Sequence, residues 1–181
     1  EASIAHAENK VIATAHQSLQ ASADFFRAAS ITSVVLGDTV TGEASEVAKV
    51  YAALVREIRS HNQPFKPPVA LISGGECTVT VRGNGRGGRC VEFLTSLAVE
   101  LDGLAGVYAL AADTDGIDGT EDNAGALLFP DTAARAAQLG LSAKAMLANN
   151  DGYSYFEALN DLLVTGPTRT NVNDYRVILI L

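Results

Sequence analysis

The sequence predicts an α/β fold, in which a mixed or mostly parallel sheet is flanked by helices. Short apolar runs rich in β-branched residues alternate along the chain with longer amphipathic stretches. Alanine and glycine are abundant and only 6% of the residues are aromatic, which suits helices packed closely on a sheet. We expect one domain over residues 1–181, made of a helical lead-in, a strand–helix unit and a longer remainder at 1–30, 31–65 and 66–181.

Composition limits the partners and the compartment. The formal charge of −8 argues against a nucleic-acid partner, whose binding surfaces usually carry clustered positive charge. The two cysteines, Cys77 and Cys90, indicate a reducing compartment without a disulfide framework. No apolar run reaches transmembrane length and no signal-peptide pattern opens the chain, so we expect a soluble, cytoplasmic protein without a membrane partner. Because the sequence opens on Glu1 without a methionine, we expect it to be part of something longer.

The first third of the chain predicts a helix, a strand, a second helix and a connector. Residues 2–29 carry an apolar stripe at helical spacing without Gly or Pro. Ile31–Gly37 is a β-branched run, and residues 43–59 have the buried face of an amphipathic helix. His61–Pro68 holds three prolines and predicts a connector. We assign no chemistry to this part, because its histidines have no Cys or acid at metal-ligand spacing.

The predicted function is organised around residues 71–92. A strand expected over Val69–Ile72 leads through the turn Gly74-Gly75-Glu76 to a second strand over Thr78–Val81, as the arms of a short hairpin. A loop with four glycines in six residues follows and leads into a helix expected over 89–101. Glycines let backbone amides approach a ligand, and the free N–H groups at the start of a helix point towards any anion.

Three arginines lie in or beside this loop, namely Arg82, Arg86 and Arg89. Their guanidinium groups suit phosphate or carboxylate oxygens. Arg89 falls in the first turn of the expected helix, an unfavourable place for a cation unless an anion is bound beside it. The loop therefore predicts an anion site, with a plain surface turn as the alternative.

A run of carboxylates follows the next apolar strand, Val107–Ala112. Ten residues contain five acids, at Asp113, Asp115, Asp118, Glu121 and Asp122. Open α/β sheets place their ligand sites at the carboxyl ends of strands, and oxygen-only ligands suit Mg²⁺ better than zinc. The spacing does not match an EF-hand. Asp-Gly turn chemistry explains any one of these acids, but not all of them together.

The last part of the chain predicts short elements around one polar loop. A strand is expected over 124–129, three short helices over 132–139, 142–148 and 153–159, and two more strands over 161–165 and 175–181. The loop 166–174 between the last two strands is dense in hydroxyls and amides. Such a polar hairpin is either a well-capped turn or a third wall of the site.

Three polar loops that converge would supply arginines for oxyanions and carboxylates for Mg²⁺, the parts that phosphoryl transfer requires. The ending of a standard P-loop is absent. A dinucleotide site is the second reading, because Gly83-x-Gly85-x-x-Gly88 follows a strand and precedes a helix, although the expected ribose-binding acid has no clear candidate. Serine hydrolysis ranks lower, since no Gly-x-Ser-x-Gly elbow exists. A non-catalytic ligand-binding or interface domain stays open.

Five separated motifs carry a resemblance to a known family: Ser73-Gly-Gly-Glu, Thr78-Val-Thr-Val-Arg-Gly, Gly85-Arg-Gly-Gly-Arg, Thr114-Asp-Gly-Ile-Asp-Gly and Gly166-Pro-Thr-x-Thr-Asn-Val-Asn-Asp. Together they closely resemble the C-terminal, so-called MOFRL domain of the class II glycerate kinases. This resemblance implies ATP-dependent phosphorylation of D-glycerate with Mg²⁺, by a two-domain kinase whose C-terminal part this chain would be. Many such sequences carry the name hydroxypyruvate reductase, and an NAD(P)-dependent reductase is the alternative.

The resemblance also implies roles for particular residues. Arg89 would contact substrate or phosphate, Asp115 would lie at the catalytic centre and Asn171 would orient bound groups. Asp115 and Asp118 would hold the metal. Substrate or phosphate is expected to bind at Gly74, Gly75, Glu76, Arg82, Gly85, Arg86, Gly87, Gly88, Thr168 and Thr170.

Two departures from the family pattern affect these expectations. Cys90 and Val91 stand where the family usually has Asn-Gln, just after Arg89. Family members are over twice this length, and their N-terminal domain supplies a lysine and much of the nucleotide site. We therefore expect the chain to be a fragment that is inactive without an N-terminal kinase domain. A homodimer is one possible assembly.

Overall fold

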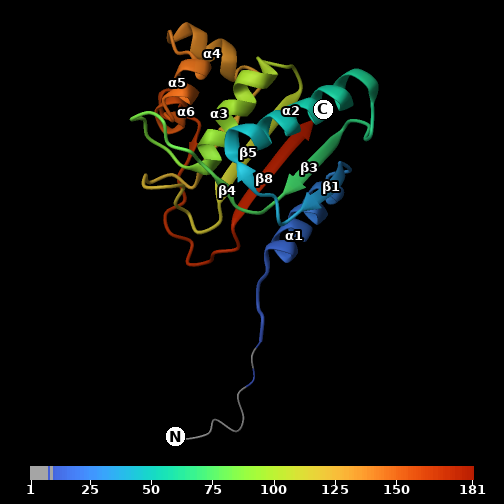
Figure 1. Cartoon of the computed structure of the whole chain (residues 1–181). Helices are drawn as coiled ribbons and strands as arrows, with labels where there is room; N and C mark the ends of the chain where they lie inside the picture. Colours follow the sequence, from blue (N-terminus) through green and yellow to red (C-terminus); the bar gives the residue numbers. More distant parts are fainter. Residues whose placement is uncertain (1–7, 9) are drawn as a thin grey trace, which may run out of the picture.

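A six-stranded mixed sheet forms the centre of the molecule, with the strand order β1-β3-β8-β5-β6-β7 (Figure 1). The computed structural model describes residue 8 and residues 10–181. In this sheet β1 and β3 are parallel, and the remaining neighbours are antiparallel. The strands are β1 (Thr32–Gly37), β3 (Val69–Ser73), β5 (Val107–Asp113), β6 (Gly125–Leu128), β7 (Leu162–Leu163) and β8 (Asp174–Ile180). The predicted α/β class with a mixed sheet is confirmed.

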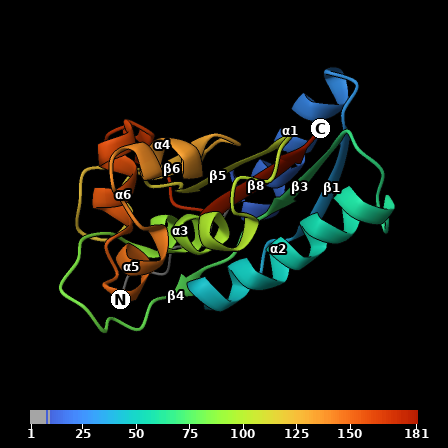
Figure 2. The same cartoon turned by 90° about the horizontal axis from the view of Figure 1, so that it is seen from above.

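Helices cover both faces of the sheet (Figure 2). Helix α1 (Ala15–Ala28) lies on one face, where Leu19 and Ala23 pack with Ala70 and Ile72 of β3. The other face carries α2 (Ala44–His61) and α3 (Arg89–Leu101), and beyond α3 lie α4 (Thr132–Gln138), α5 (Ala143–Ala148) and α6 (Gly152–Leu159). Within the described residues, no helix is long and apolar enough to cross a membrane.

Helix α3 is the centre of the larger hydrophobic core. Its Phe93, Leu94 and Leu97 are fully buried, because α2, α5, α6 and the sheet surround the helix. The rings of Phe93 and Tyr51 of α2 meet edge to face, with centroids 5.6 Å apart. Burying such side chains is worth roughly 1.5–3 kcal/mol each. The buried side chains of α3 therefore hold this helix firmly against the rest of the core.

The N-terminal helix is shorter than predicted. It begins at Ala15, where the Thr14 side chain accepts a hydrogen bond from the backbone N–H of Gln17 at 3.1 Å. Residues 10–14 are not helical, so the prediction of helix from residue 2 is wrong there. Residues 1–7 and 9 lie outside the described part. Thr14 caps the first turn and so marks where the helix begins, and Val11 of the predicted stripe lies before it and is exposed.

Both predicted hairpins are wrong. Strand β4 (Cys77–Thr78) is shorter than expected and pairs in parallel with β2 (Gly42–Glu43), not with β3. Two residues after β4, Thr80 donates to the Glu43 carboxylate, from its N at 2.8 Å and its Oγ1 at 3.0 Å.

Near the C-terminus, β7 pairs with β6, whereas β8 lies between β3 and β5. The polar loop that follows β7 therefore passes the ends of β6 and β5 before it reaches the start of β8.

Candidate functional site

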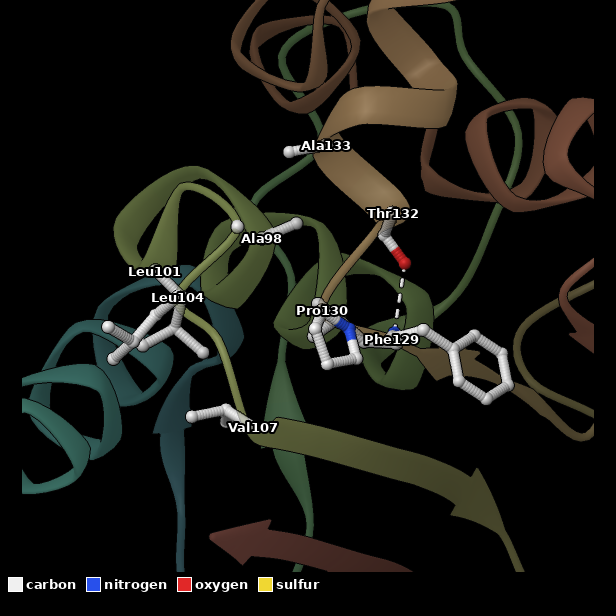
Figure 3. A pocket seen from close by; sticks show the side chains of 10 residues that line it. Ala98, Leu101, Leu104, Val107, Phe129, Pro130, Thr132 and Ala133 are labelled. Atoms are coloured by element: carbon white, nitrogen blue, oxygen red, sulfur yellow. Dashed lines mark hydrogen bonds between the residues drawn. The ribbon is translucent and has the colours of Figure 1, made fainter. Parts of the chain in front are cut away.

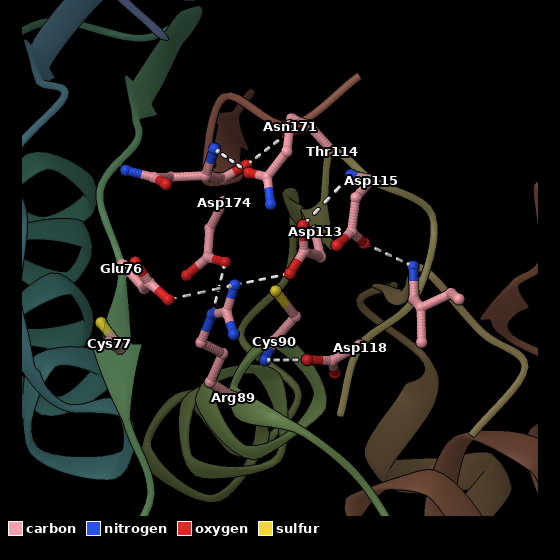
Figure 4. Close-up of polar contacts among 12 residues, drawn as sticks. Glu76, Cys77, Arg89, Cys90, Asp113, Thr114, Asp115, Asp118, Asn171 and Asp174 are labelled. Atoms are coloured by element: carbon pink, nitrogen blue, oxygen red, sulfur yellow. Dashed lines mark hydrogen bonds and ion pairs between the residues drawn. The ribbon is translucent and has the colours of Figure 1, made fainter. Parts of the chain in front are cut away.

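Arg89 lies at the start of α3 among three carboxylates (Figure 4). Its Nη2 is 2.5 Å from Asp113 Oδ2 and 3.8 Å from Glu76 Oε1, and its Nε is 2.7 Å from Asp174 Oδ1. Partial burial lowers the pKa of Arg89, but Asp174 and Asp113 outweigh this effect and raise it overall. The protein itself thus supplies the anions that stabilise a cation in the first turn of this helix.

A second arginine, Arg176 of β8, lies behind Asp174. It is 1% exposed and donates to Asp174, to the carbonyl of Gly74 at 3.0 Å and to the Cys77 sulfur at 3.2 Å. Asp174 therefore accepts hydrogen bonds from both arginines, which fixes its orientation and that of Arg89. Sequence reasoning missed Arg176. The available signal was a charged residue inside the apolar run of the last strand.

The backbone of the diglycine turn, Gly74–Gly75, lies close against the backbone of Val40. Gly75 has φ +102°, and a Cβ there would lie 2.2 Å from the Val40 carbonyl oxygen. The Gly75 carbonyl accepts a hydrogen bond from Asp174 N at 3.0 Å. The turn therefore anchors the start of β8 beside Arg89. Glu76, next in the chain, is exposed and points into the same cluster.

Asp118, an expected metal ligand, caps α3 with its side chain. Its Oδ1 accepts from Cys90 N at 3.0 Å and its Oδ2 from Val91 N at 2.9 Å. Gly88 allows this approach, because a Cβ there would lie 2.2 Å from Asp118 Oδ1. Burial raises the pKa of Asp118 to about 6, although the two N–H donors oppose the shift. Each oxygen accepts one backbone N–H group, so Asp118 satisfies two of the free donors at the start of α3.

In residues 82–88, which we call the glycine loop, the first five backbone amides bind protein atoms as well. Consecutive N–H groups from Arg82 to Arg86 donate to the segment Asn149–Asp151, which we call the Asn turn. The acceptors are Asn150 Oδ1 at 2.7 and 3.0 Å, Asn149 Oδ1 at 3.1 Å, Asn149 O at 2.9 Å and Asp151 Oδ1 at 3.0 Å. These amides are thus engaged by the protein. Sequence reasoning missed the Asn turn as their partner.

The three arginines do not share one site. Arg86 lies over the Tyr153 ring, 4.2 Å from its centroid, and its Nη2 is 2.6 Å from Glu121 Oε2. Arg82 is exposed and lines a pocket of about 470 Å³ between α2, α3 and α5. Arg89 lines a different pocket. The three guanidinium groups therefore serve separate contacts.

The pocket beside Arg89, which we call the Arg89 pocket, has a volume of about 220 Å³. It is lined by Cys77, Val79, Val81, Gly85, Gly87, Gly88, Arg89, Glu92, Gly119 and Asn150. Within the described part of the chain, Arg89 Nη1 makes no hydrogen bond, so one edge of the guanidinium stays available to an anion. Burial raises the pKa of Glu92 to about 7, against the opposing hydrogen bond from Asn150.

Residues 113–122, the acidic loop, and residues 166–174, the Asn/Thr loop, are tied together at the same edge of the sheet. Thr168 N donates to the Asp115 carbonyl at 2.9 Å, and Thr114 Oγ1 donates to the Asn173 carbonyl at 2.7 Å. Asn171 Oδ1 accepts from Asn173 N at 3.0 Å, which leaves its NH₂ group free to donate. Thr170 is exposed on this loop, as is Thr168. These loops lie beside the Arg89 cluster in Figure 4.

The described residues contain no cluster of three or more His, Cys, Asp or Glu that could hold a metal ion. Asp115 Oδ1 accepts from Ile117 N at 2.9 Å, and within the described residues no group donates to its second oxygen. Mg²⁺ is commonly held by one or two carboxylates together with substrate phosphates. Among the described residues, Asp115 therefore offers one carboxylate oxygen at this position and not a complete set of metal ligands.

A third cavity, at the far end of α3, is apolar and small (Figure 3). Its volume of about 10 Å³ suffices for one water at most. It is lined by residues such as Leu101, Leu104 and Val107, and Phe129 N donates to Thr132 Oγ1 at 2.9 Å beside it. It is no candidate for a substrate site.

Comparison with known proteins adds independent findings. A family model described as "MOFRL family" matches residues 69–174. A protein of Agrobacterium vitis named "Putative hydroxypyruvate reductase" is 46% identical over 173 residues, which cover 94% of this chain and 45% of that protein. The D-glycerate 2-kinase of Thermotoga maritima is 42% identical over 139 residues, covering 77% of this chain and 33% of the kinase.

Solved structures share the fold. The crystal structure of a glycerate kinase from Thermotoga maritima superposes with a TM-score of 0.92 at 35% identity, covering 96% of this chain and 42% of that one. A protein from Pyrococcus horikoshii superposes with a TM-score of 0.91 at 31% identity. The chain thus spans less than half the length of each relative described here.

Proposed function

The chain belongs to the MOFRL family, and on this basis we propose that it is the C-terminal part of a kinase that transfers the γ-phosphoryl group of ATP to D-glycerate. The observation that carries the proposal is the guanidinium of Arg89, fixed by Asp113 and Asp174 with one edge available to an anion. It lies in a fold shared at 35% identity with a glycerate kinase.

Arg89 would supply a positive charge and would orient the bound anion. Phosphoryl transfer depends mainly on positioning and charge neutralisation, and with Nε and Nη2 held by Asp174 and Asp113, the N–H groups of Nη1 would donate to phosphate or carboxylate oxygens. The side-chain NH₂ of Asn171 would orient a bound oxygen from the neighbouring loop, because its Oδ1 is already used by Asn173 N. The same edge of the sheet also carries Thr168, Thr170 and Glu76.

Mg²⁺ would neutralise developing negative charge on the phosphates when it is bound. Asp115 is the carboxylate that we assign to it, through the oxygen not used by Ile117 N. We do not assign Asp118 to the metal, because its two oxygens hold the start of α3.

The remaining part of the site would come from an N-terminal domain. The relatives named above as kinases are more than twice as long as the matched region. We therefore propose that the 181-residue chain alone lacks kinase activity and that substrate binds between it and the missing part.

A hydroxypyruvate reductase is the rival, favoured by the name of the Agrobacterium vitis relative. A dinucleotide site needs free glycine-loop amides to approach the pyrophosphate. Here the amides of residues 82–86 donate to the Asn turn. This engagement makes the rival weaker.

The test uses the full-length protein, in which this chain follows an N-terminal domain. We expect ADP formation from ATP, D-glycerate and Mg²⁺, and no NADH oxidation with hydroxypyruvate. Arg89→Lys keeps the charge but loses the fork of donors, so kcat/KM should fall by roughly 100-fold. Arg56→Ala, at an exposed arginine of α2, is the control and should keep its activity. NADH oxidation without ADP formation would overturn the kinase proposal.

A further inference from the structure

Both the oxygen and the NH₂ group of the Asn150 side chain make hydrogen bonds. It lies between α5 and α6 with φ +54°, a left-handed conformation that asparagine tolerates. Its Oδ1 accepts from Arg82 N at 2.7 Å and Gly83 N at 3.0 Å. Its Nδ2 donates to Glu92 Oε1 at 3.0 Å and, more weakly, to the Thr80 carbonyl at 3.5 Å. One side chain thus joins the glycine loop to α3.

Glu92 determines which way the amide faces. A reversed amide would direct its NH₂ group at the two backbone N–H donors and its oxygen at the Glu92 carboxylate, and both contacts would be repulsive. Glu92 is 5% exposed and lies one helical turn after Arg89 on the same helix. Through Asn150, Glu92 therefore fixes the position of the glycine loop relative to α3, the helix that carries Arg89.

The glycine loop also lies too close to the Asn turn to move independently. A Cβ at Gly83 would lie 2.3 Å from the Asn149 carbonyl oxygen, and one at Gly85 would lie 2.4 Å from the Asp151 side chain. Gly85 lines the Arg89 pocket together with Asn150 and Glu92. A change in the Asn150 contacts would thus move one wall of the pocket while leaving the ion pairs of Arg89 in place.

We propose that Asn150 is a positioning residue for the phosphoryl-transfer site, held in orientation by Glu92, and that it fixes the glycine loop as one wall of the Arg89 pocket. This inference rests on the proposed kinase function for its kinetic consequence. Its structural part, the locking of the loop, stands on the contacts alone.

The structural test is amide hydrogen exchange in the full-length protein. In Asn150→Ala, the amides of Arg82 and Gly83 lose their acceptor, and we expect their exchange to accelerate at least about tenfold. Asn160→Ala is the matched control, because Asn160 also has a left-handed conformation, φ +57°, but ends α6 away from the loop. Equal exchange in the two variants would overturn the proposal.

The kinetic test reverses the hydrogen bond between Asn150 and Glu92, in which Asn150 is now the donor and Glu92 the acceptor. We expect Asn150→Asp to raise the KM for D-glycerate more than it lowers kcat, because a carboxylate would face Glu92. Adding Glu92→Gln should recover most of the loss, since the glutamine NH₂ can donate to the new carboxylate. A general loss of packing would not be reversed by this second change. Failure of the double variant to recover would refute the role of Glu92.

The two proposals fail separately. If the unaltered protein forms no ADP, the kinase function is wrong, but hydrogen exchange still decides whether Asn150 locks the loop. If ADP forms and Asn150→Ala changes neither exchange nor KM, the positioning role is wrong and the kinase function stands.

Discussion

Asp118 shows at the scale of one residue that a side chain can have contacts which its chain neighbours do not indicate. It belongs to a run of five acids that suggests a magnesium site. The structure directs its carboxylate at the first amides of α3, 27 and 28 residues away in the chain. No local pattern encodes this pairing. Only Gly88, which leaves space for the carboxylate, gives a hint in the sequence.

Removal of the cap should cost stability. We expect Asp118→Ala to lower the free energy of unfolding by about 1–3 kcal/mol, because two buried N–H donors lose their acceptor. Asp131→Ala is the matched control, since Asp131 precedes α4 without a capping hydrogen bond. Urea denaturation of the 181-residue chain measures both. Equal losses would show that Asp118 does not cap α3.

Glu92 should make stability depend on pH. Burial raises its pKa from 4.5 to about 7, so the folded chain binds a proton that the unfolded chain releases. This contribution is complete below about pH 4.5 and is lost as the pH rises towards 7. Glu92→Gln should therefore flatten the pH dependence in this window and stabilise the chain at pH 8 by on the order of 2 kcal/mol.

The measurement is the free energy of unfolding from pH 4 to pH 8 for the two proteins. Glu57→Gln, at an exposed position of α2, is the control and should leave the pH dependence unchanged. Parallel curves for Glu92→Gln and the unaltered chain would show that Glu92 ionises normally in the folded state.

At the scale of elements, the sequence predicts what local periodicity determines. Helix α3 was expected over 89–101 and lies there, and α2 was expected over 43–59 and spans 44–61. Strand partners were not predictable, because pairing joins distant residues, such as Val69 with Ile180. Both predicted hairpins assumed that neighbouring strands pair. Strand β8 pairs instead with β3 and β5, which buries its apolar side chains on both faces.

Helix α1 offers a test of the packing on the second face of the sheet. Leu19→Ala should lower the free energy of unfolding by about 2–4 kcal/mol, because this leucine is 2% exposed and packs on β3. Phe25→Ala on the same helix should cost less than about 1 kcal/mol, since Phe25 is 72% exposed. Chemical denaturation compares the two. A larger loss for Phe25 would mean that the opposite face of α1 is the buried one.

At the scale of the whole molecule, the candidate site depends on all parts of the fold at once. Arg89 comes from α3, Asp113 from the end of β5 and Asp174 from the start of β8, which the sheet brings to one edge. The sequence could predict that polar loops follow these elements. It could not predict that the arginine would be paired with the protein's own acids, because those contacts follow from the strand order.

Folding and activity should separate in this molecule. The core on both faces of the sheet lies within the chain, so the 181-residue chain should unfold in one transition, with coincident curves by circular dichroism and tyrosine fluorescence. It should form no ADP alone, because the proposed site needs an N-terminal domain. Activity should appear when that domain is added as a separate polypeptide, and a chain carrying Arg89→Ala should not restore it. ADP formation by the isolated chain would place the whole active site on this side of the interface and remove the need for a second domain.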